Sequence, residues 1–483
     1  MSAVGHSEGL TPSERHLKKL GSRSFLSLWS YANVYRDQGG GKELCDLLVI
    51  FGDSVVIFSD KHCAFPNSGD DAKDWSRWYQ RAVAKSADQI FGAERWLRDH
   101  PGRVFVDSKC TVKLPIGLPE PSKMRVHRVV VALGASTRCQ GALGDNGSLM
   151  LASPKGGQQV PPPFTVFPNV PPDKRIVHVF DEHSLDVVLD ELDTIQDFLA
   201  YLRKKEALLA STGIRAPSEQ DLLAFYLQNV NAQDEHDFVL PEACDFFGLQ
   251  EGLWEHISEQ PAYAAKKARD RPSYAWDRLI EYLVGRIASG DLTMGGDTEL
   301  STHELGLRVM AAERRVARRM LANAFLGLAL NTPRGQPFAV RVVLSPSKAG
   351  AAYVFVLLKH DLGTNYDDYQ RERLERLLAY VDVVKYLYRD LQHVVGIGTE
   401  TQDSPGRSET MAYFDTSEWP AEALERGRWL HEVKGLMKSA RTWHAHEREY
   451  PSLRQLSAPV DPHDARRRRN REKRRRRELR DKR

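Results

Sequence analysis

A mixed α/β protein with more than one domain is the fold class that this sequence predicts, and three observations predict it. Two short apolar runs, at residues 47–51 and 55–58, flank Gly52-Asp53-Ser54, which is the pattern of a tight β-hairpin. Apolar residues then recur at helical spacing over residues 74–100. The length of 483 residues is enough for two or three domains with buried cores.

Two more helices and several short strands complete the expected first domain. Thr11-Pro12-Ser13-Glu14 has the composition of a capping box with proline at the first helical position, so a helix should begin there. We expect strands at 103–107 and 127–133, followed by a Gly/Pro-rich loop or insertion over 141–173. A strand at 176–180 and a helix at 184–211 come next.

The C-terminal third predicts a separate α+β unit, reached through a helical connecting region. Its order of helix, hairpin, helix and strands repeats that of the N-terminal part, so an internal duplication with an inactive second copy is one hypothesis. The expected elements are a helix at 302–328, strands at 338–344 and 352–358, a helix at 367–391, and strands at 394–397 and 410–414.

The composition is typical of a soluble globular protein. Hydrophobic residues make up 41% of the chain and charged residues 28%. No apolar run approaches the 18 residues of a membrane span, and the N-terminal MSAVGHSEGL lacks the features of a secretory signal. The five cysteines are scattered without a C-x-x-C pair, which predicts reduced thiols in a cytoplasmic protein, without disulfides or structural zinc.

Positive charge is concentrated at the C-terminus. Residues 465–483 carry thirteen Lys or Arg and three Asp or Glu, a net charge of +10 in a chain whose total is +3. Such a tail offers sequence-independent, salt-sensitive contacts to phosphates, so we expect it to bind nucleic acid. Nonspecific binding to RNA or anionic surfaces and a nuclear-localisation signal are the alternatives. The expected nucleic-acid-binding residues are Arg466, Arg467, Arg468, Arg469, Arg474, Arg475, Arg476 and Arg477.

Acidic residues and a lysine lie at the two open ends of the predicted hairpin. Glu43 and Asp46 lie at the start of its first strand, and Ser59, Asp60 and Lys61 end the second. The two ends of an antiparallel hairpin meet, so these side chains should converge at one rim of the sheet. Two carboxylates can hold a divalent cation on phosphate oxygens, and an ammonium group can orient the attacking water. The pattern therefore suits phosphodiester hydrolysis.

This spacing resembles the PD-(D/E)xK, or restriction-endonuclease-like, nuclease superfamily. The family signature is an aspartate followed after about a dozen residues by an acidic-x-Lys tripeptide that closes the next strand. The first carboxylate lies here in Glu43-Leu44-Cys45-Asp46, and the tripeptide is Ser59-Asp60-Lys61, with serine at the acidic position. The resemblance covers about residues 10–135. It implies a restriction-endonuclease-like mixed sheet flanked by helices, with the core order helix, three strands, helix, strand.

The resemblance implies a role for each residue of the rim. Asp46, together with Glu43 or Asp60, would hold Mg²⁺ or Mn²⁺, while Lys61 would orient the water or stabilise developing charge and Ser59 would help to position a water. Strand alternation sends Ser59 and Lys61 to one face and Asp60 to the other. Three alternatives follow: a bulge turns Asp60 inward, Glu43 supplies the missing carboxylate, or the site does not cut.

The first helix offers one more candidate. Members of the superfamily often place an additional active-site glutamate there, and Glu14 is at that place in the sequence. Its part in the capping box already accounts for this residue.

The expected organisation has five segments. They are a nuclease-like α/β domain (1–140), an insertion with a strand and a helix that completes it (141–215), a helical connecting region (216–300), an α+β C-terminal domain (301–440), and a linker with the basic tail (441–483).

These expectations combine into a metal-dependent nuclease that hydrolyses DNA in bacterial antiviral defence or DNA processing. We expect nucleic acid, a second copy of the chain or another protein as partners, and no membrane. The alternative is a noncatalytic nucleic-acid-binding or assembly protein with a degenerate nuclease fold, which the serine at position 59 favours. A third possibility is an inert scaffold whose tail binds RNA. The sequence contains no phosphate-binding loop ahead of a helix, so we expect no ATP hydrolysis.

Five arginines recur within the helix expected at 302–328. We expect them to form a basic face in solvent opposite an apolar face, and a nucleic-acid groove is the alternative. They are Arg308, Arg314, Arg315, Arg318 and Arg319.

Overall fold

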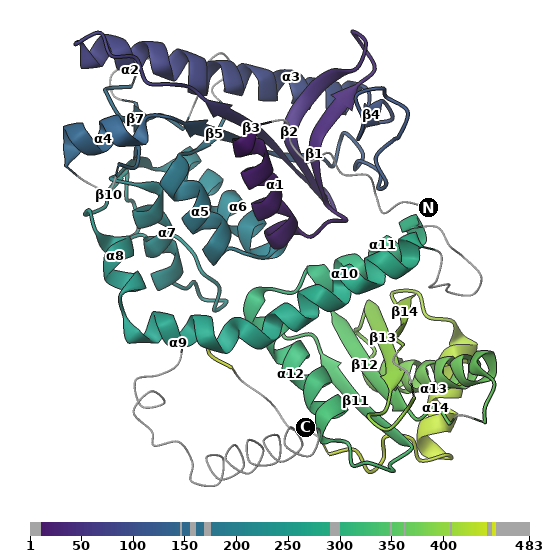
Figure 1. Cartoon of the computed structure of the whole chain (residues 1–483). Coiled ribbons are helices and arrows are strands. Elements are labelled where there is room, and N and C mark those ends of the chain that lie inside the picture. Colours follow the sequence, from purple (N-terminus) through teal and green to yellow (C-terminus); the bar gives the residue numbers. More distant parts are fainter. Residues whose placement is uncertain are drawn as a thin grey trace, which may run out of the picture.

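Three β-sheets and the helices packed on them form the described structure, which confirms the mixed α/β class (Figure 1). The computed structural model describes residues 11–144, 147–154, 161–168, 175–289, 300–347, 350–361, 363–405, 408–441 and 447–450. Within these ranges no helix has both the length and the apolar character required to cross a bilayer. All five cysteines are free thiols, as the sequence predicts.

The first sheet has six strands in the order β4-β1-β2-β3-β5-β8. Its first half is antiparallel, from β4 through β1 and β2 to β3, whereas β5 and β8 run parallel to β3. The parallel step from β3 to β5 is made through a long helical segment, as parallel pairs require. The strands are β1 (Ser30–Arg36), β2 (Lys42–Phe51), β3 (Ser54–His62), β4 (Val104–Phe105), β5 (Arg125–Leu133) and β8 (His178–Phe180).

Helices cover both faces of this sheet (Figure 1). On one face lie α1 (Pro12–Phe25), α5 (Glu182–Glu191) and α6 (Ile195–Ser211), and aromatic contacts join Phe25 and Phe58 to Phe198. The opposite face carries α2 (Asp71–Tyr79), the π-helical turn η1 (Gln80–Ala84) and α3 (Lys85–Asp99), which follow one another without a break. The expected helix at 74–100 is therefore present. It begins earlier because the Asp70 side chain caps it, accepting from the N–H of Lys73.

The β2–β3 hairpin has the two-residue turn that its sequence predicts. Gly52 adopts a positive φ of 57°, and Phe51 pairs with Ser54 across the turn. The paired register runs back from there to Leu47 opposite Phe58. This register leaves the two open strand ends, with their polar residues, at the rim away from the turn.

A second, four-stranded sheet and a group of helices follow the first sheet along the chain. Its order is β10-β9-β6-β7. The strands are β6 (Met150–Ala152), β7 (Thr165–Val166), β9 (Gly213–Ala216) and β10 (Phe246–Gly248). The accompanying helices are α4 (Ser136–Leu143), α7 (Glu219–Gln228), α8 (Leu253–Ser258), α9 (Pro261–Asp270), the 3₁₀ turn η2 (Arg271–Ser273) and α10 (Tyr274–Ala288).

The third sheet belongs to the C-terminal unit and has the order β11-β12-β13-β14. The β11–β12 and β13–β14 pairs are antiparallel, and β12 and β13 are parallel. Hairpin, helix and parallel strand thus occur in the same order as in β2, β3, α3 and β5, and duplication remains a hypothesis. The elements are α11 (Leu300–Ala311), α12 (Arg315–Asn331), β11 (Phe338–Leu344), β12 (Ala351–Leu358), α13 (Tyr366–Leu387), β13 (His393–Glu400), β14 (Thr410–Asp415) and α14 (Ala421–Glu432).

Helices α9 to α12 lie between the first and third sheets (Figure 1). One apolar core continues through them, because Tyr353 and Phe355 of β12 pack with Trp276 of α10. The helix expected at 302–328 is two helices, since the chain leaves helical geometry at Arg314, whose φ and ψ are −71° and 165°.

The expected basic face is wrong for three of its five arginines, which are buried in ion pairs. Arg315, Arg318 and Arg319 have relative exposures of 5%, 0% and 1%. Arg315 binds Asp193, at 2.7 Å, and shares Asp277 with Arg318, and Arg319 binds a third aspartate, Asp270. Helical periodicity does not distinguish a solvated charge from a buried and paired one. The other two arginines form ion pairs nearer the surface: Arg308 with Glu304 and Arg314 with Glu235.

Removing one member of this network should be costly. We expect Arg318→Ala to lower the free energy of unfolding by about 3–5 kcal/mol, because buried Asp277 loses one of its two guanidinium partners and the carbonyls of Ala311 and Glu313 lose their donor. Asp277→Asn should cost a similar amount, and the double variant should cost less than the sum of the two. Urea denaturation of the four proteins measures this coupling. As a control, Arg371→Ala breaks an exposed ion pair with Asp368 and should change stability by less than about 0.5 kcal/mol.

Candidate active site

Asp46 and Asp60 meet where the β2–β3 ladder ends. The last paired residues are Leu47 and Phe58, and beyond them Oδ2 of Asp46 accepts the backbone N–H of Asp60 at 2.6 Å. The carboxylate thus takes the place of a ladder hydrogen bond. Both residues are buried, with relative exposures of 8% and 7%. The predicted convergence of the two strand ends therefore occurs.

Burial dominates the protonation of this pair. Burial, together with the nearby carboxylates of Glu43 and Asp60, raises the pKa of Asp46 to about 7, although the N–H of Asp60 opposes the shift. Burial likewise raises the pKa of Asp60 to about 6, against the influence of the Ser13 hydroxyl. Neither oxygen of Asp60 forms a hydrogen bond of ordinary geometry within the described residues. Ionising such buried carboxylates costs free energy unless a cation binds beside them.

Asn33 links two further carboxylates to this rim, and sequence reasoning missed it. Its side-chain amide donates to Oε1 of Glu43 at 2.7 Å and to Oε2 of Glu14 at 3.3 Å. Asn33 is fully buried in β1 and has a φ of 50°, next to the bulge in the β1–β2 register. The signal in the sequence is a lone polar residue within the apolar run SYANVYR.

Glu14 forms the capping box expected from the sequence and also lies near the carboxylates of the rim. Its carboxylate accepts the N–H of Thr11 at 3.2 Å and its own N–H donates to the Thr11 hydroxyl, which completes the capping box of α1. The same carboxylate contacts Asn33 and raises the pKa of Glu43, Asp46 and Asp60. Four acidic side chains, from α1, β2 and β3, thus influence one another electrostatically.

Ser59 and Lys61 have different surroundings from Asp60. Ser59 is fully buried, and its hydroxyl has no hydrogen-bond partner among the described residues. Lys61 is exposed and lowers the pKa of Glu43, whose burial raises it. Two of the three alternatives take the missing carboxylate from Asp60 or from Glu43. The structure places both side chains close enough to Asp46 to raise its pKa.

The carboxylates are not gathered as closely as the ligands of one bound ion. Among the described residues, one group of three potential ligand side chains has all its ligand atoms within 4.8 Å of one another, and it is His127, His178 and Glu206. The acidic rim does not reach this spacing. The two oxygens of Asp60, which are buried without a hydrogen-bond donor among the described residues, still suit a hard divalent cation.

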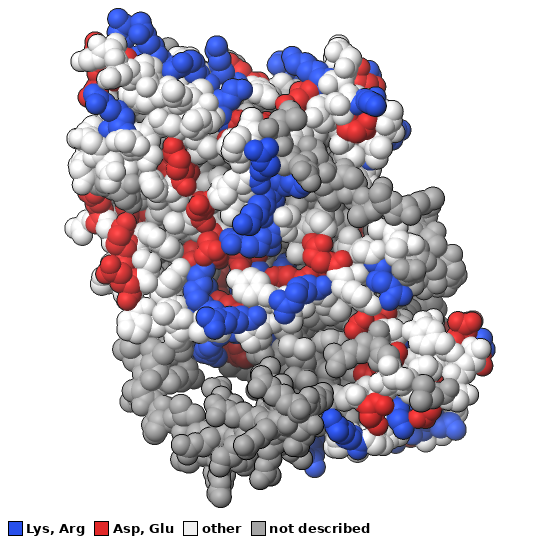
Figure 2. Space-filling view, viewed as in Figure 1, with Lys and Arg blue, Asp and Glu red and all other residues white. Residues whose placement is uncertain are grey.

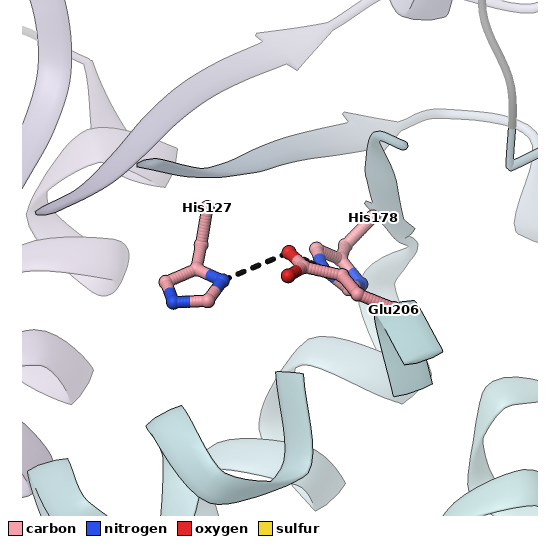
Figure 3. A group of neighbouring side chains, drawn as sticks. All are labelled: His127, His178 and Glu206. Carbon is pink, nitrogen blue, oxygen red and sulfur yellow. Dashed lines mark hydrogen bonds and ion pairs between the residues drawn. The ribbon is translucent and has the colours of Figure 1, made fainter. Parts of the chain in front are cut away.

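The His127, His178 and Glu206 cluster lies on β5, β8 and α6 (Figure 3). Oε1 of Glu206 accepts from Nδ1 of His127 at 2.8 Å and from Nε2 of His178 at 3.0 Å. Burial lowers the pKa of His178, which is therefore neutral. Burial raises the pKa of Glu206, but the two histidine hydrogen bonds outweigh it and hold the pKa well below its usual range.

Hydrogen bonding explains this cluster better than metal binding does. A metal ion would take the two nitrogens that now donate, and the ring protons would move to Nε2 of His127 and Nδ1 of His178. Both of these atoms are buried without a hydrogen-bond partner. Each unpaired N–H would cost about 1–3 kcal/mol. We therefore assign the cluster a structural role between the sheet and α6.

The arginines of the basic tail, from Arg466 to Arg477, lie outside the described residues. Comparison of the chain with protein-family models, with curated proteins and with solved structures gave no match.

In metal-free protein, stability should fall as pH rises from about 4 to about 7. The unfolded chain releases these protons near the ordinary aspartate pKa of 3.8, whereas folded Asp46 retains its proton to about 7. At pH 8, Asp46→Asn should therefore be about 2–4 kcal/mol more stable than wild type, since each pKa unit is worth about 1.4 kcal/mol. The new amide oxygen can still accept from Asp60, and the advantage should shrink toward pH 4.

Urea denaturation in EDTA between pH 4 and 8 measures this difference. The charged groups facing the rim, Glu14, Glu43, His16, His62 and Lys61, are retained in the variant. Asp53→Asn, at the turn end of the same hairpin, is the matched control and should show no pH-dependent gain. A wild-type protein whose stability rises over this range would show that Asp46 is ionised in the folded state.

Glu206→Gln should destabilise the fold by about 1–3 kcal/mol, because one amide oxygen replaces a carboxylate that serves two buried donors. Glu120→Gln, which breaks an exposed ion pair with Lys123, is the control and should have little effect. Stoichiometric zinc in purified wild-type protein, absent from Glu206→Gln, would contradict the structural role and identify a metal centre.

Proposed function

We propose that this chain is a metal-dependent phosphodiesterase with a restriction-endonuclease-like N-terminal fold, acting on DNA. The observation that carries the proposal is the buried Asp46–Asp60 contact at the open rim of the hairpin, where Glu14, Glu43 and Lys61 also lie. Cytoplasmic host defence or DNA processing is the setting that such an activity would suit.

The order of elements supports this fold. Helix α1 is followed by three antiparallel strands, β1 to β3, then by the α2–η1–α3 helical segment and by β5 parallel to β3. The resemblance of the sequence implies the same order of helix, three strands, helix and strand. The acidic residues lie on the elements that the resemblance assigns to them: Glu14 on α1, Asp46 on β2 and Asp60 on β3.

The residues of the rim can be given chemical roles. Asp46 and Asp60, with Glu43, would hold Mg²⁺ or Mn²⁺, which supplies Lewis-acid activation of a phosphate and its attacking water. With a pKa of about 7, Asp46 is partly protonated at neutral pH, and cation binding would release that proton, whereas Asp60, with a pKa of about 6, is mostly ionised there. Lys61 is exposed beside Glu43 and can stabilise charge that develops on a phosphate oxygen.

A noncatalytic nucleic-acid-binding protein is the second candidate. The observation that favours it is the spacing of the carboxylates, because no three of them in the described residues lie within 4.8 Å of one another. Burial of Ser59 points the same way, since its hydroxyl lies inside the protein and cannot position a solvent water at the rim.

Cleavage of plasmid and linear DNA with Mg²⁺, Mn²⁺ or EDTA separates these candidates. We expect metal-dependent cleavage that Asp46→Asn and Lys61→Ala each reduce at least about 100-fold, as loss of a group that stabilises the transition state typically does. Asp53→Asn should cleave as wild type does. Mg²⁺ should also raise the melting temperature of wild type but not of Asp46→Asn. Cleavage that survives both rim substitutions would overturn this assignment of the site, and salt-sensitive binding without any cleavage would establish the noncatalytic candidate.

A further inference from the structure

A row of exposed cations lies on the helical segment that covers one face of the first sheet. Arg77, Arg81 and Lys85 occur at intervals of four residues along α2, η1 and the start of α3, and all three are exposed. Figure 2 shows Lys and Arg side chains along the top of the molecule, where Figure 1 places α2 and α3. The opposite side of the segment is apolar, with Trp78, Ala82 and Val83 fully buried.

The π-helical turn at Gln80–Ala84 straightens this row. In a regular α-helix, side chains four residues apart drift by about 40° per interval, so three of them spread over about 80°. A π turn contains more residues, so each residue rotates through a smaller angle and the drift is reduced. The three cations can therefore point in one direction, about 6 Å apart along the axis. This spacing is close to that of adjacent phosphates along one nucleic-acid strand.

These cations line a groove rather than a flat surface. The groove has a volume of about 530 Å³ and is lined by Pro66, Ser76, Arg77, Gln80, Arg81 and Lys85. None of the three cations has a carboxylate partner within 4.0 Å in the described part of the chain. They differ in this from the arginines of α12, whose charges are neutralised by aspartates. The uncompensated charge is available to an anionic ligand.

Hydrogen bonds join the groove to the segment that follows β3. The guanidinium of Arg81 donates to the carbonyl of Ala64 at 3.1 Å, and the indole N–H of Trp78 donates to the carbonyl of Cys63 at 3.0 Å. These carbonyls belong to the segment that directly follows Lys61 and the end of β3. The groove is thus joined to the segment that begins three residues beyond Asp60, on the face of the sheet that α2, η1 and α3 cover.

We propose that this groove binds the phosphate backbone of one nucleic-acid strand and leads that strand to the acidic rim. The inference rests on the proposed function, because it assigns a binding path for the substrate of the same site. Among the described residues, no aromatic side chain lines the groove, so bases have no surface there for stacking and contact is to phosphates. Binding should therefore be independent of base sequence and sensitive to salt.

Fluorescence anisotropy with a labelled single-stranded oligonucleotide, in EDTA so that no cleavage occurs, tests this path. We expect Arg77→Gln/Lys85→Gln to weaken binding about tenfold at 0.1 M salt. The slope of log affinity against log salt should fall by about 1.4, since each single-strand phosphate contact contributes about 0.7. Arg81 is left in place because it also holds the carbonyl of Ala64.

The matched control is Arg95→Gln/Lys109→Gln, which removes the same charge from exposed positions outside the groove. It should bind with the wild-type slope. Equal affinity and slope for the two double variants would overturn the proposal. So would competition by polyglutamate as effective as competition by an unlabelled oligonucleotide, because the groove would then accept any polyanion. The basic tail is present in all the proteins, so the differences report the groove.

The outcomes also separate this inference from the proposed function. Asp46→Asn should bind the oligonucleotide as wild type does, because the groove does not depend on the rim carboxylates. If wild type binds through the groove but cuts no DNA, the groove is established and the hydrolytic function fails. If wild type cuts DNA and the groove variant binds and cuts equally well, the hydrolytic site stands and the groove is wrong.

Discussion

The contact between the Asp46 carboxylate and the backbone N–H of Asp60 is the constraint on which the candidate site depends. It lies just beyond Leu47 and Phe58, the last pair of the β2–β3 ladder, so the two strands separate with acidic side chains between them. The helix start at Thr11 and the bulge beside Asn33 bring Glu14 and Glu43 to the same place. An apolar residue at position 46 would leave the N–H of Asp60 without this acceptor and remove the central carboxylate. Local folding and chemistry therefore use the same atoms.

Arginine has two opposite uses in this protein. On α12, three buried guanidinium groups form ion pairs with aspartates of the α5–α6 loop, α9 and α10. These aspartates neutralise their charge inside the protein. Buried pairs of this kind add little net stability compared with an apolar core, but they tolerate no missing partner and so fix how the helices dock. On α2 and η1 the cations have no such partners and face solvent. Burial and pairing, rather than the number of arginines, separate the structural group from the binding group.

Local sequence signals predicted the elements well, and they failed where long-range contacts decide the outcome. The turn at Gly52, the capping box at Thr11 and the apolar periodicity of the long helix each act within a few residues, and each is present in the structure. Asn33 was missed because its positive φ and its two carboxylate partners depend on strands that are distant in sequence. The burial of Arg318 depends likewise on Asp277, 41 residues away. The π-helical turn has no signature that periodicity detects.

The two large sheets differ in how their edges are closed. The first ends in strands of two and three residues, β4 and β8, so few backbone groups remain free to pair with another chain. The third ends in β11 and β14, of seven and six residues. Long apolar edges are templates for aggregation, and charged side chains are a common protection. Arg341 lies in the middle of the apolar edge FAVRVVL and is held by the carbonyl of Ala324. Partial unfolding of α12 would release Arg341 from Ala324 and uncover the face of β11 that α12 covers.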